Sequence, residues 1–284
     1  MKVKFYGTRG SIPTPGGKFS TYGGNTTCVL VNGVGGAFGV LDAGSGLRVL
    51  GDELGERLAA SVEAGTAQPI PILLSHTHWD HIQGFPFFKP TFDPRHEVLV
   101  TIHGREDEQR NLEGVFAGQM QDDYFPIPFG AKGAAIQFNQ TDFSDYSGPG
   151  GSRVNASPHR HPGGAYGYRI NGVERVVCFC TDVEHEGATA DAIDERVVEL
   201  ARGADLLIHD AQYTQEEMAD KRGWGHSSWQ QAVEVARRAG VSALALTHHD
   251  PEHDDEFLAD IEQQCRQEFP DSFFAREGME IDLG

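Results

Sequence analysis

The sequence has few cysteines, no long apolar run and a small share of basic residues. Four cysteines among 284 residues are too few for the disulfide framework of a small secreted protein. The apolar runs are far shorter than the roughly 20 residues that cross a membrane, and the segment Met1–Gly7 lacks the apolar core of a secretory signal. We therefore expect a cytoplasmic protein without a membrane partner.

Acidic side chains far outnumber basic ones. Lys and Arg total 23 against 42 Asp and Glu, which gives a net charge of −19. A field of this sign repels polyanions and disfavours a long nucleic-acid partner. A small anion held by metal ions is compatible with it, because the cations invert the local sign. We expect a small anionic substrate rather than long DNA or RNA.

Composition and length are those of an ordinary globular protein. Hydrophobic residues make up 39% and charged residues 23%, and 284 residues suit one large domain, which we predict to span residues 1–284. Strands over 3–6 and 27–31 precede a helix over 47–64, and a further apolar strand ends near residue 74. This order predicts an α/β layered sandwich.

A dense group of ionisable side chains follows the apolar run Pro71–Leu74. His76, His78, Asp80 and His81 form an HxHxDH motif directly after that run. Chemistry in α/β proteins collects beyond the carboxyl ends of strands. Imidazole and carboxylate are ligands that suit zinc, manganese or iron, and crowding them is costly unless they bind something. The motif therefore predicts a metal site.

Later strand ends carry further ionisable residues. Apolar runs lead into Asp182, into His209 and Asp210, and into His248 and His249. His159 and His161 flank an arginine at another strand end, and His226 precedes a predicted helix over 228–239. Taken alone, a strand-terminal aspartate is as readily a helix cap, so these residues depend on the motif for their interpretation.

Residues 76–81 resemble the metal-binding signature of the metallo-β-lactamase-fold hydrolases, and the later strand ends follow in that family's order. The resemblance implies a four-layer αββα sandwich of two mixed sheets that holds two divalent metal ions, zinc first and manganese or iron as alternatives. It also implies the ligands: one ion on His76, His78 and His161, the other on Asp80, His81 and His248, with Asp182 as the bridge.

The pair formed by Asp210 and His226 resembles ribonuclease Z and its phosphodiesterase relatives, including phosphoribosyl cyclic phosphodiesterases. In that branch a strand ending His-Glu supplies a carboxylate to the histidine of a Gly-His-Ser-Thr motif. Here Asp210 stands in place of the glutamate and Ser228 in place of the threonine. The resemblance implies that His226, held by Asp210, protonates the leaving oxygen. Asp80, Asp210 and His226 are the expected catalytic residues.

The function implied is hydrolysis of a small cyclic phosphodiester by a metal-bridging hydroxide. Cyclic nucleotides, cyclic dinucleotides and ribosyl cyclic phosphates are the expected substrates, and a homodimer is implied at the level of the family. A β-lactam, thioester or sulfate-ester hydrolase is the alternative, followed by a tRNA 3′-processing endonuclease. A binding protein on the same scaffold would lack one or more metal ligands, and all seven are present.

Substrate contacts are predicted outside the ligand set. Arg9 in a Gly-rich loop, Asn25 and His159 are the candidates. Two aromatic and Pro-rich segments, about 85–95 and 120–133, are candidate lids. Asp42 ends a strand and suits two roles equally, a cap for the following helix or a partner that orients a motif histidine.

Overall fold

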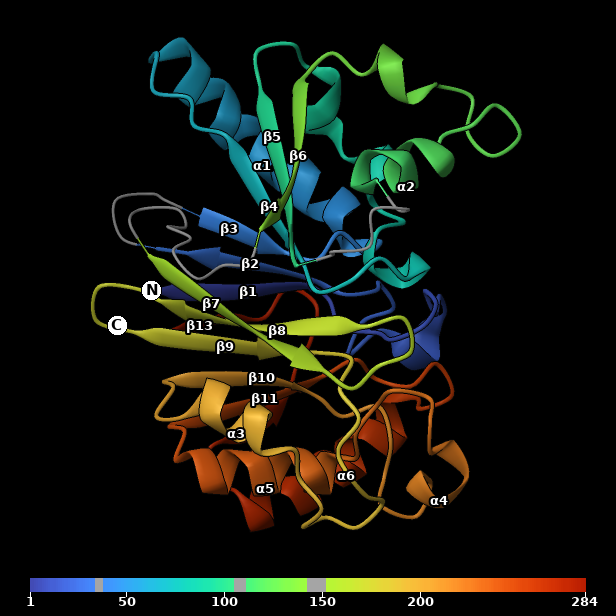
Figure 1. The fold of residues 1–284 in the computed structure, drawn as a ribbon, viewed down its shortest axis with the longest axis vertical. Coiled ribbons are helices and arrows are strands. Elements are labelled where there is room, and N and C mark those ends of the chain that lie inside the picture. Colours follow the sequence, from blue (N-terminus) through green and yellow to red (C-terminus); the bar gives the residue numbers. More distant parts are fainter. Residues whose placement is uncertain (34–37, 105–110, 142–151) are drawn as a thin grey trace.

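In the computed structural model, two β-sheets face each other and helices cover both outer faces (Figure 1). The structure describes residues 1–33, 38–104, 111–141 and 152–284. Helices α1 and α2 lie against one sheet, and α3, α5 and α6 lie against the other (Figure 1). This four-layer αββα arrangement confirms the predicted fold class. Along the described residues, no helix combines the length and apolar character needed to cross a membrane.

The first sheet has the strand order β13-β1-β2-β3-β4-β5-β6. Its strands are β1 (Lys2–Gly7), β2 (Cys28–Asn32), β3 (Phe38–Leu41), β4 (Ile70–Leu74), β5 (Glu97–His103), β6 (Ala135–Thr141) and β13 (Glu280–Asp282). Strands β3 to β6 run parallel, and β4 is buried along its whole length, as its apolar run predicted. Strand β13, which the sequence analysis did not identify, pairs with β1 and brings the two termini together.

The second sheet has the order β12-β11-β10-β9-β8-β7. Its strands are β7 (Arg153–His159), β8 (Ala165–Asn171), β9 (Val176–Cys180), β10 (Leu206–Asp210), β11 (Ala243–Thr247) and β12 (Ser272–Phe274). Strands β9, β10 and β11 are parallel, so their carboxyl ends lie at one edge of the sheet. The predicted ligands and acids that follow these strands are thereby brought side by side.

The helices fill the outer layers and the connections. They are α1 (Gly46–Glu63), α2 (Leu112–Gly118), α3 (Glu195–Ala201), α4 (Met218–Lys221), α5 (Trp229–Ala239) and α6 (Asp255–Glu268), with short 3-10 turns η1 (Gly17–Phe19), η3 (Trp79–His81), η4 (Phe85–Phe87), η5 (Lys89–Phe92) and η6 (Phe129–Ala131). Helix α5 begins with a capping box between Ser228 and Gln231 and ends at Gly240 in the left-handed conformation, as helix-end chemistry favours.

Apolar side chains pack between each pair of layers. The core between the two sheets includes Phe5, Leu73, Phe179 and Ile208, which are at most 2% exposed. Burying one such side chain stabilises the fold by roughly 1.5–3 kcal/mol. The two sheets are therefore held in a fixed relation, which places the loops from both sheets at a common site.

The two aromatic segments predicted as lids contact each other. The Lys132 ammonium donates to the Thr91 hydroxyl over 2.7 Å and lies 3.7 Å from the centre of the Phe92 ring. The rings of Phe87 and Phe125 meet edge to face at 5.3 Å. Burial lowers the pKa of Lys132 to about 8. The segments form one joined unit next to the metal motif, and their role as a lid stays a prediction.

Candidate metal centre and active site

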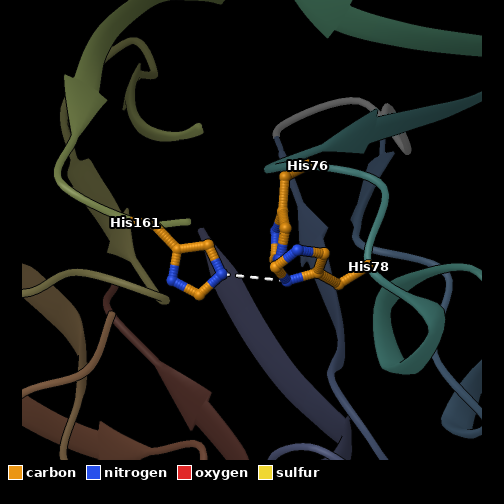
Figure 2. A group of neighbouring side chains, drawn as sticks. All are labelled: His76, His78 and His161. Atoms are coloured by element: carbon orange, nitrogen blue, oxygen red, sulfur yellow. Dashed lines mark hydrogen bonds between the residues drawn. The ribbon is translucent and has the colours of Figure 1, made fainter. Parts of the chain in front are cut away.

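Three histidines from two loops form the first candidate metal site. His76 and His78 follow β4, and His161 faces them from the loop after β7 (Figure 2). The Nε2 atom of His161 lies 2.9 Å from Nδ1 of His78, and the buried Nε2 of His76 has no hydrogen-bond partner among the described residues. Three converging imidazole nitrogens, one of them buried and unpartnered, fit a divalent cation.

Four ligand atoms form the second candidate site. Nε2 of His81 lies 3.3 Å from Nε2 of His248, 3.3 Å from Oδ2 of Asp80 and 3.2 Å from Oδ2 of Asp182. Nε2 of His248 lies 3.3 and 3.4 Å from the same two carboxylate oxygens. Ligand atoms about 2.0–2.1 Å from a zinc ion at the centre of a tetrahedron are roughly 3.4 Å apart. The spacing of these donor atoms therefore fits a divalent cation.

Asp182 faces both sites with different oxygens. Its Oδ1 atom lies 3.8 Å from Nε2 of His76 and 3.8 Å from Nε2 of His161. Its Oδ2 atom belongs to the second group. This is the arrangement that a bridging carboxylate requires, and it agrees with the bridge that the sequence resemblance implied.

Backbone strain is concentrated at this centre. Among the described residues other than glycine, positive φ angles occur at Ser11, Asp42, Asp182 and His248. Asp182 and His248 are predicted ligands, Asp42 orients one, and the backbone N–H of Ser11 donates to the Asp80 carboxylate over 2.8 Å. Residues in sparsely populated conformations persist where the surrounding structure fixes them, and they cluster at functional sites.

Asp42 orients a ligand and does not cap α1. Its Oδ2 atom accepts from Nδ1 of His81 over 2.8 Å and from the Ser75 hydroxyl, and its Oδ1 atom accepts from the Ser75 backbone N–H. The N-terminal cap position of α1 is Ser45. A carboxylate on one ring nitrogen fixes the tautomer and aims the other nitrogen at the metal position. The structure thus decides between the two roles that the sequence left open.

Two more ligands are oriented in the same way. Nδ1 of His161 donates to the Gly225 carbonyl over 2.9 Å, and Nδ1 of His248 pairs with the Gln212 side-chain oxygen over 3.1 Å. Three supporting residues are not themselves predicted ligands, so only the fold identifies their role: Ser75, Gln212 and Gly225.

Protonation states favour metal binding at the first site. Burial lowers the pKa of His76, His78 and His161, which keeps the imidazoles neutral. Burial opposes ionisation of Asp80 and Asp182, but the surrounding imidazoles hold the pKa of both carboxyls well below the ordinary value. Neutral imidazole and ionised carboxylate are the forms that ligate.

The carboxylates of the second site raise the pKa of two of its histidines. Burial alone would lower the pKa of His81 and His248, but the carboxylates around them raise the pKa of both, that of His248 to about 9. Because a ligating imidazole must be deprotonated, a divalent cation would replace these protons.

Asp210 and His226 form the predicted acid pair beside the metal cluster. Nδ1 of His226 donates to Oδ2 of Asp210 over 2.8 Å, and the backbone N–H of Ser227 donates to the other carboxylate oxygen over 2.9 Å. The shorter acid thus reaches the histidine. Burial opposes ionisation of Asp210, but His226 holds the pKa of that carboxyl below its usual value. The His226 ring stacks on His248 with ring centroids 4.9 Å apart.

Glu184 is a supporting residue that the sequence analysis missed. Its buried carboxylate accepts from the backbone N–H groups of Gly223 and Gly225, each over 2.9 Å, and forms an ion pair with Arg222 at 2.9 Å. This loop supplies the carbonyl that orients His161 and leads directly into His226. Glu184 therefore positions one predicted ligand and the predicted acid.

Replacing Glu184 with glutamine is expected to lower kcat by about 10- to 100-fold, because a small displacement of reacting groups has effects of this size. With bis(p-nitrophenyl) phosphate, which carries no second phosphate, KM and metal content are expected to stay within about twofold, since no ligand is lost. Steady-state kinetics and elemental analysis measure both. Glu186→Gln, an exposed neighbour, is the matched control. Equal kcat values in the two variants would contradict a positioning role.

The side chains of two predicted substrate contacts form hydrogen bonds within the protein. Arg9 is 0% exposed and donates to the backbone carbonyls of Gly23, Asp250 and His253, so it joins distant loops and does not face a substrate phosphate. The side-chain amide of Asn25 donates to Glu277 and its oxygen accepts from the Ser45 hydroxyl. The prediction for Arg9 is corrected because its buried donors are used within the fold, whereas half-buried Asn25 stays a prediction.

The third predicted contact, His159, also lies away from the cluster. Its Nδ1 atom bonds to the Thr181 carbonyl over 3.1 Å, and its ring is packed beneath Gly167. Burial lowers the pKa of His159 to about 4. His249, which the sequence ranked behind His248, bonds to the Ala275 carbonyl over 2.9 Å. The structure places His161 and His248 at the cluster and their neighbours in the protein interior.

The chain belongs to the beta-lactamase superfamily, whose family model, described as "Beta-lactamase superfamily domain", matches residues 40–249. A ribonuclease Z of Haloarcula marismortui is 25% identical over 292 residues, which cover 87% of this chain and 86% of that protein. The metallo-beta-lactamase fold protein YhfI from Bacillus subtilis superposes with a TM-score of 0.68 at 20% identity, covering 99% of each chain. A diphosphatase from the PhnP family superposes with a TM-score of 0.64 at 18% identity, covering 99% of this chain and 97% of that one.

These similarities confirm the resemblance on which the sequence analysis depends. The chain is a hydrolase of the metallo-β-lactamase fold with a His/Asp cluster suited to divalent metal ions. The ribonuclease Z relative agrees with the prediction of a metal-dependent phosphoric diester hydrolase.

Proposed function

We propose that the protein is a dinuclear phosphodiesterase that hydrolyses a small cyclic phosphodiester, namely a cyclic nucleotide, a cyclic dinucleotide or a ribosyl cyclic phosphate. The observation that supports this proposal most strongly is the hydrogen-bonded pair of Asp210 and His226 beside two groups of metal-ligand atoms. A β-lactam or thioester hydrolase has less need for such a pair. The alkoxide that leaves a phosphodiester is a strong base and gains most from protonation.

Seven side chains would hold the two ions, with zinc preferred because imidazole and carboxylate are among its ordinary ligands. They are His76, His78, Asp80, His81, His161, Asp182 and His248. When bound, the ions supply hydroxide at neutral pH and positive charge for the phosphoryl oxygens. His81, His161 and His248 are each held through Nδ1, so their Nε2 atoms are presented to the centre.

His226 carries the proton for the leaving oxygen. Its Nδ1 hydrogen is donated to Asp210, so Nε2 is the ring nitrogen that can carry the acid proton. Asp210 is itself fixed by the backbone N–H groups of Ser227 and Asp182. The carboxylate stabilises the imidazolium, which can then release its Nε2 proton when the phosphorus–oxygen bond breaks.

The remaining predictions of partner and location fit this proposal. The net charge of −19 favours a small anionic substrate over a long nucleic acid. Four free, buried cysteines are compatible with a reducing cytoplasm. A homodimer stays a prediction. A ribonuclease that acts on longer RNA is the second candidate function, because the Haloarcula relative is named ribonuclease Z.

A substrate panel tests the proposal with zinc-loaded protein. It contains bis(p-nitrophenyl) phosphate, a cyclic mononucleotide, a cyclic dinucleotide, a ribosyl cyclic phosphate and a tRNA precursor, with a β-lactam, a thioester and an aryl sulfate beside them. We expect hydrolysis of a cyclic phosphodiester at the highest kcat/KM. No diester turnover by fully metallated protein would overturn the phosphodiesterase assignment, and preferential cleavage of the tRNA precursor would favour the second candidate.

A further inference from the structure

We propose that a cavity beside the first metal site binds a second anionic group of the substrate, a terminal phosphate on the same molecule as the scissile diester. The inference rests on the proposed function and narrows its substrate class. The cavity has a volume of about 500 Å3. It is lined by Arg160, His161, Pro162, Glu184, Arg222 and Gly223.

The cavity and the metal cluster share a wall. Nε2 of His161 faces His78 across the first metal site (Figure 2). The same residue lines the cavity. Arg160 is the adjacent residue in the chain. A substrate whose diester lies at the metal site can therefore extend past this imidazole and bring a second group to Arg160.

The charges that line the cavity sum to a positive value. Glu184 is paired with Arg222 at 2.9 Å, and its other oxygen accepts two backbone N–H groups, so this carboxylate is neutralised and its acceptors are occupied. Arg160 is exposed, and within residues 1–33, 38–104, 111–141 and 152–284 no acidic side chain pairs with it. The guanidinium of Arg160 therefore has no counter-charge, although the chain as a whole has a net charge of −19.

The chemistry of the free cation indicates a phosphate. A guanidinium presents a planar fork of N–H donors that matches two oxygens of a phosphate, and such charge-assisted contacts are among the strongest hydrogen bonds. A terminal phosphate also supplies more charge than a diester, so it gains more from an unpaired arginine.

The walls of the cavity are fixed before any ligand binds. The backbone N–H of Glu184 donates to the Arg160 carbonyl over 2.9 Å, which joins the loops after β7 and β9. Arg222 donates to the carbonyls of His185 and Glu186 as well as to Glu184. A preorganised cavity loses less entropy on binding than a mobile surface does.

Calorimetry on zinc-loaded protein tests the inference without turnover. Thymidine 3′,5′-bisphosphate and thymidine 5′-monophosphate are titrated into wild type, Arg160→Gln and Arg153→Gln. Arg153 is the matched control, an exposed arginine at the start of β7 that does not line the cavity. We expect wild type to bind the bisphosphate about 10- to 100-fold more tightly than the monophosphate. Arg160→Gln should lose most of that ratio, and Arg153→Gln should keep it.

Two results would overturn the inference: equal affinity of wild type for the two nucleotides, or an unchanged ratio in Arg160→Gln. Because the readout is binding, it remains decisive when the substrate panel shows no hydrolysis. Zinc content and thermal unfolding are measured for each variant, to confirm that the proteins compared are folded and contain zinc. Failure of the cavity proposal and failure of the phosphodiesterase assignment are thus separate outcomes.

Discussion

Replacing His226 with alanine is expected to lower kcat for a diester with an alkyl leaving group by about 10²–10⁴-fold. The variant has no group that can protonate the departing alkoxide, because Asp210 is ionised and fully buried behind the missing ring. Metal content is expected to stay unchanged, since His226 is not among the seven predicted ligands. Steady-state kinetics on a cyclic nucleotide and elemental analysis of the same sample provide the measurement.

The leaving group supplies an internal control for this prediction. A p-nitrophenolate leaves without protonation, so bis(p-nitrophenyl) phosphate should lose much less rate in His226→Ala than the cyclic nucleotide does. Equal losses on both substrates would mean that His226 supports the site in another way. No loss on the cyclic nucleotide would remove it from the mechanism.

Asp182→Asn is expected to remove at least one of about two bound metal ions and to abolish measurable turnover. An amide at this position is neutral and presents only one oxygen as an acceptor, whereas each Asp182 oxygen now faces a different group of imidazoles. Zinc stoichiometry after dialysis measures the loss. The change should also lower the zinc-dependent increase in thermal stability, because bound metal stabilises the folded state.

Asp260→Asn is the matched control, since this aspartate is exposed on the outer helix α6. It should retain wild-type zinc content and activity. Full zinc occupancy in Asp182→Asn would contradict the bridging role.

Most of the candidate metal centre could be predicted from the sequence, because one part of it is a local motif and the rest follows from the family resemblance. His76, His78, Asp80 and His81 lie within one turn, and their spacing alone indicates metal binding. Asp182 and His248 each follow an apolar strand, and parallel pairing of β9, β10 and β11 brings such strand ends together. The HxHxDH motif can be recognised without knowledge of long-range packing, whereas the later ligands were implied by the family resemblance.

The roles of three charged residues could not be predicted from the sequence: Arg9, Glu184 and Arg160. An arginine in a Gly-rich loop suits an anion, but two of the three carbonyls that occupy Arg9 lie some 240 positions away in the chain. Glu184 and Arg160 are ordinary charged residues in sequence. Their roles depend on how the loops after β7 and β9 meet the loop before α5, which is a property of tertiary packing.

The central claim is that two metal ions held by these residues support phosphodiester hydrolysis. Titrating metal-free protein with zinc while following bis(p-nitrophenyl) phosphate hydrolysis tests it most directly. We predict that activity rises until about two equivalents are bound per chain and then remains constant. Activity that saturates at one equivalent, or protein that binds two equivalents and hydrolyses no diester, would contradict the account.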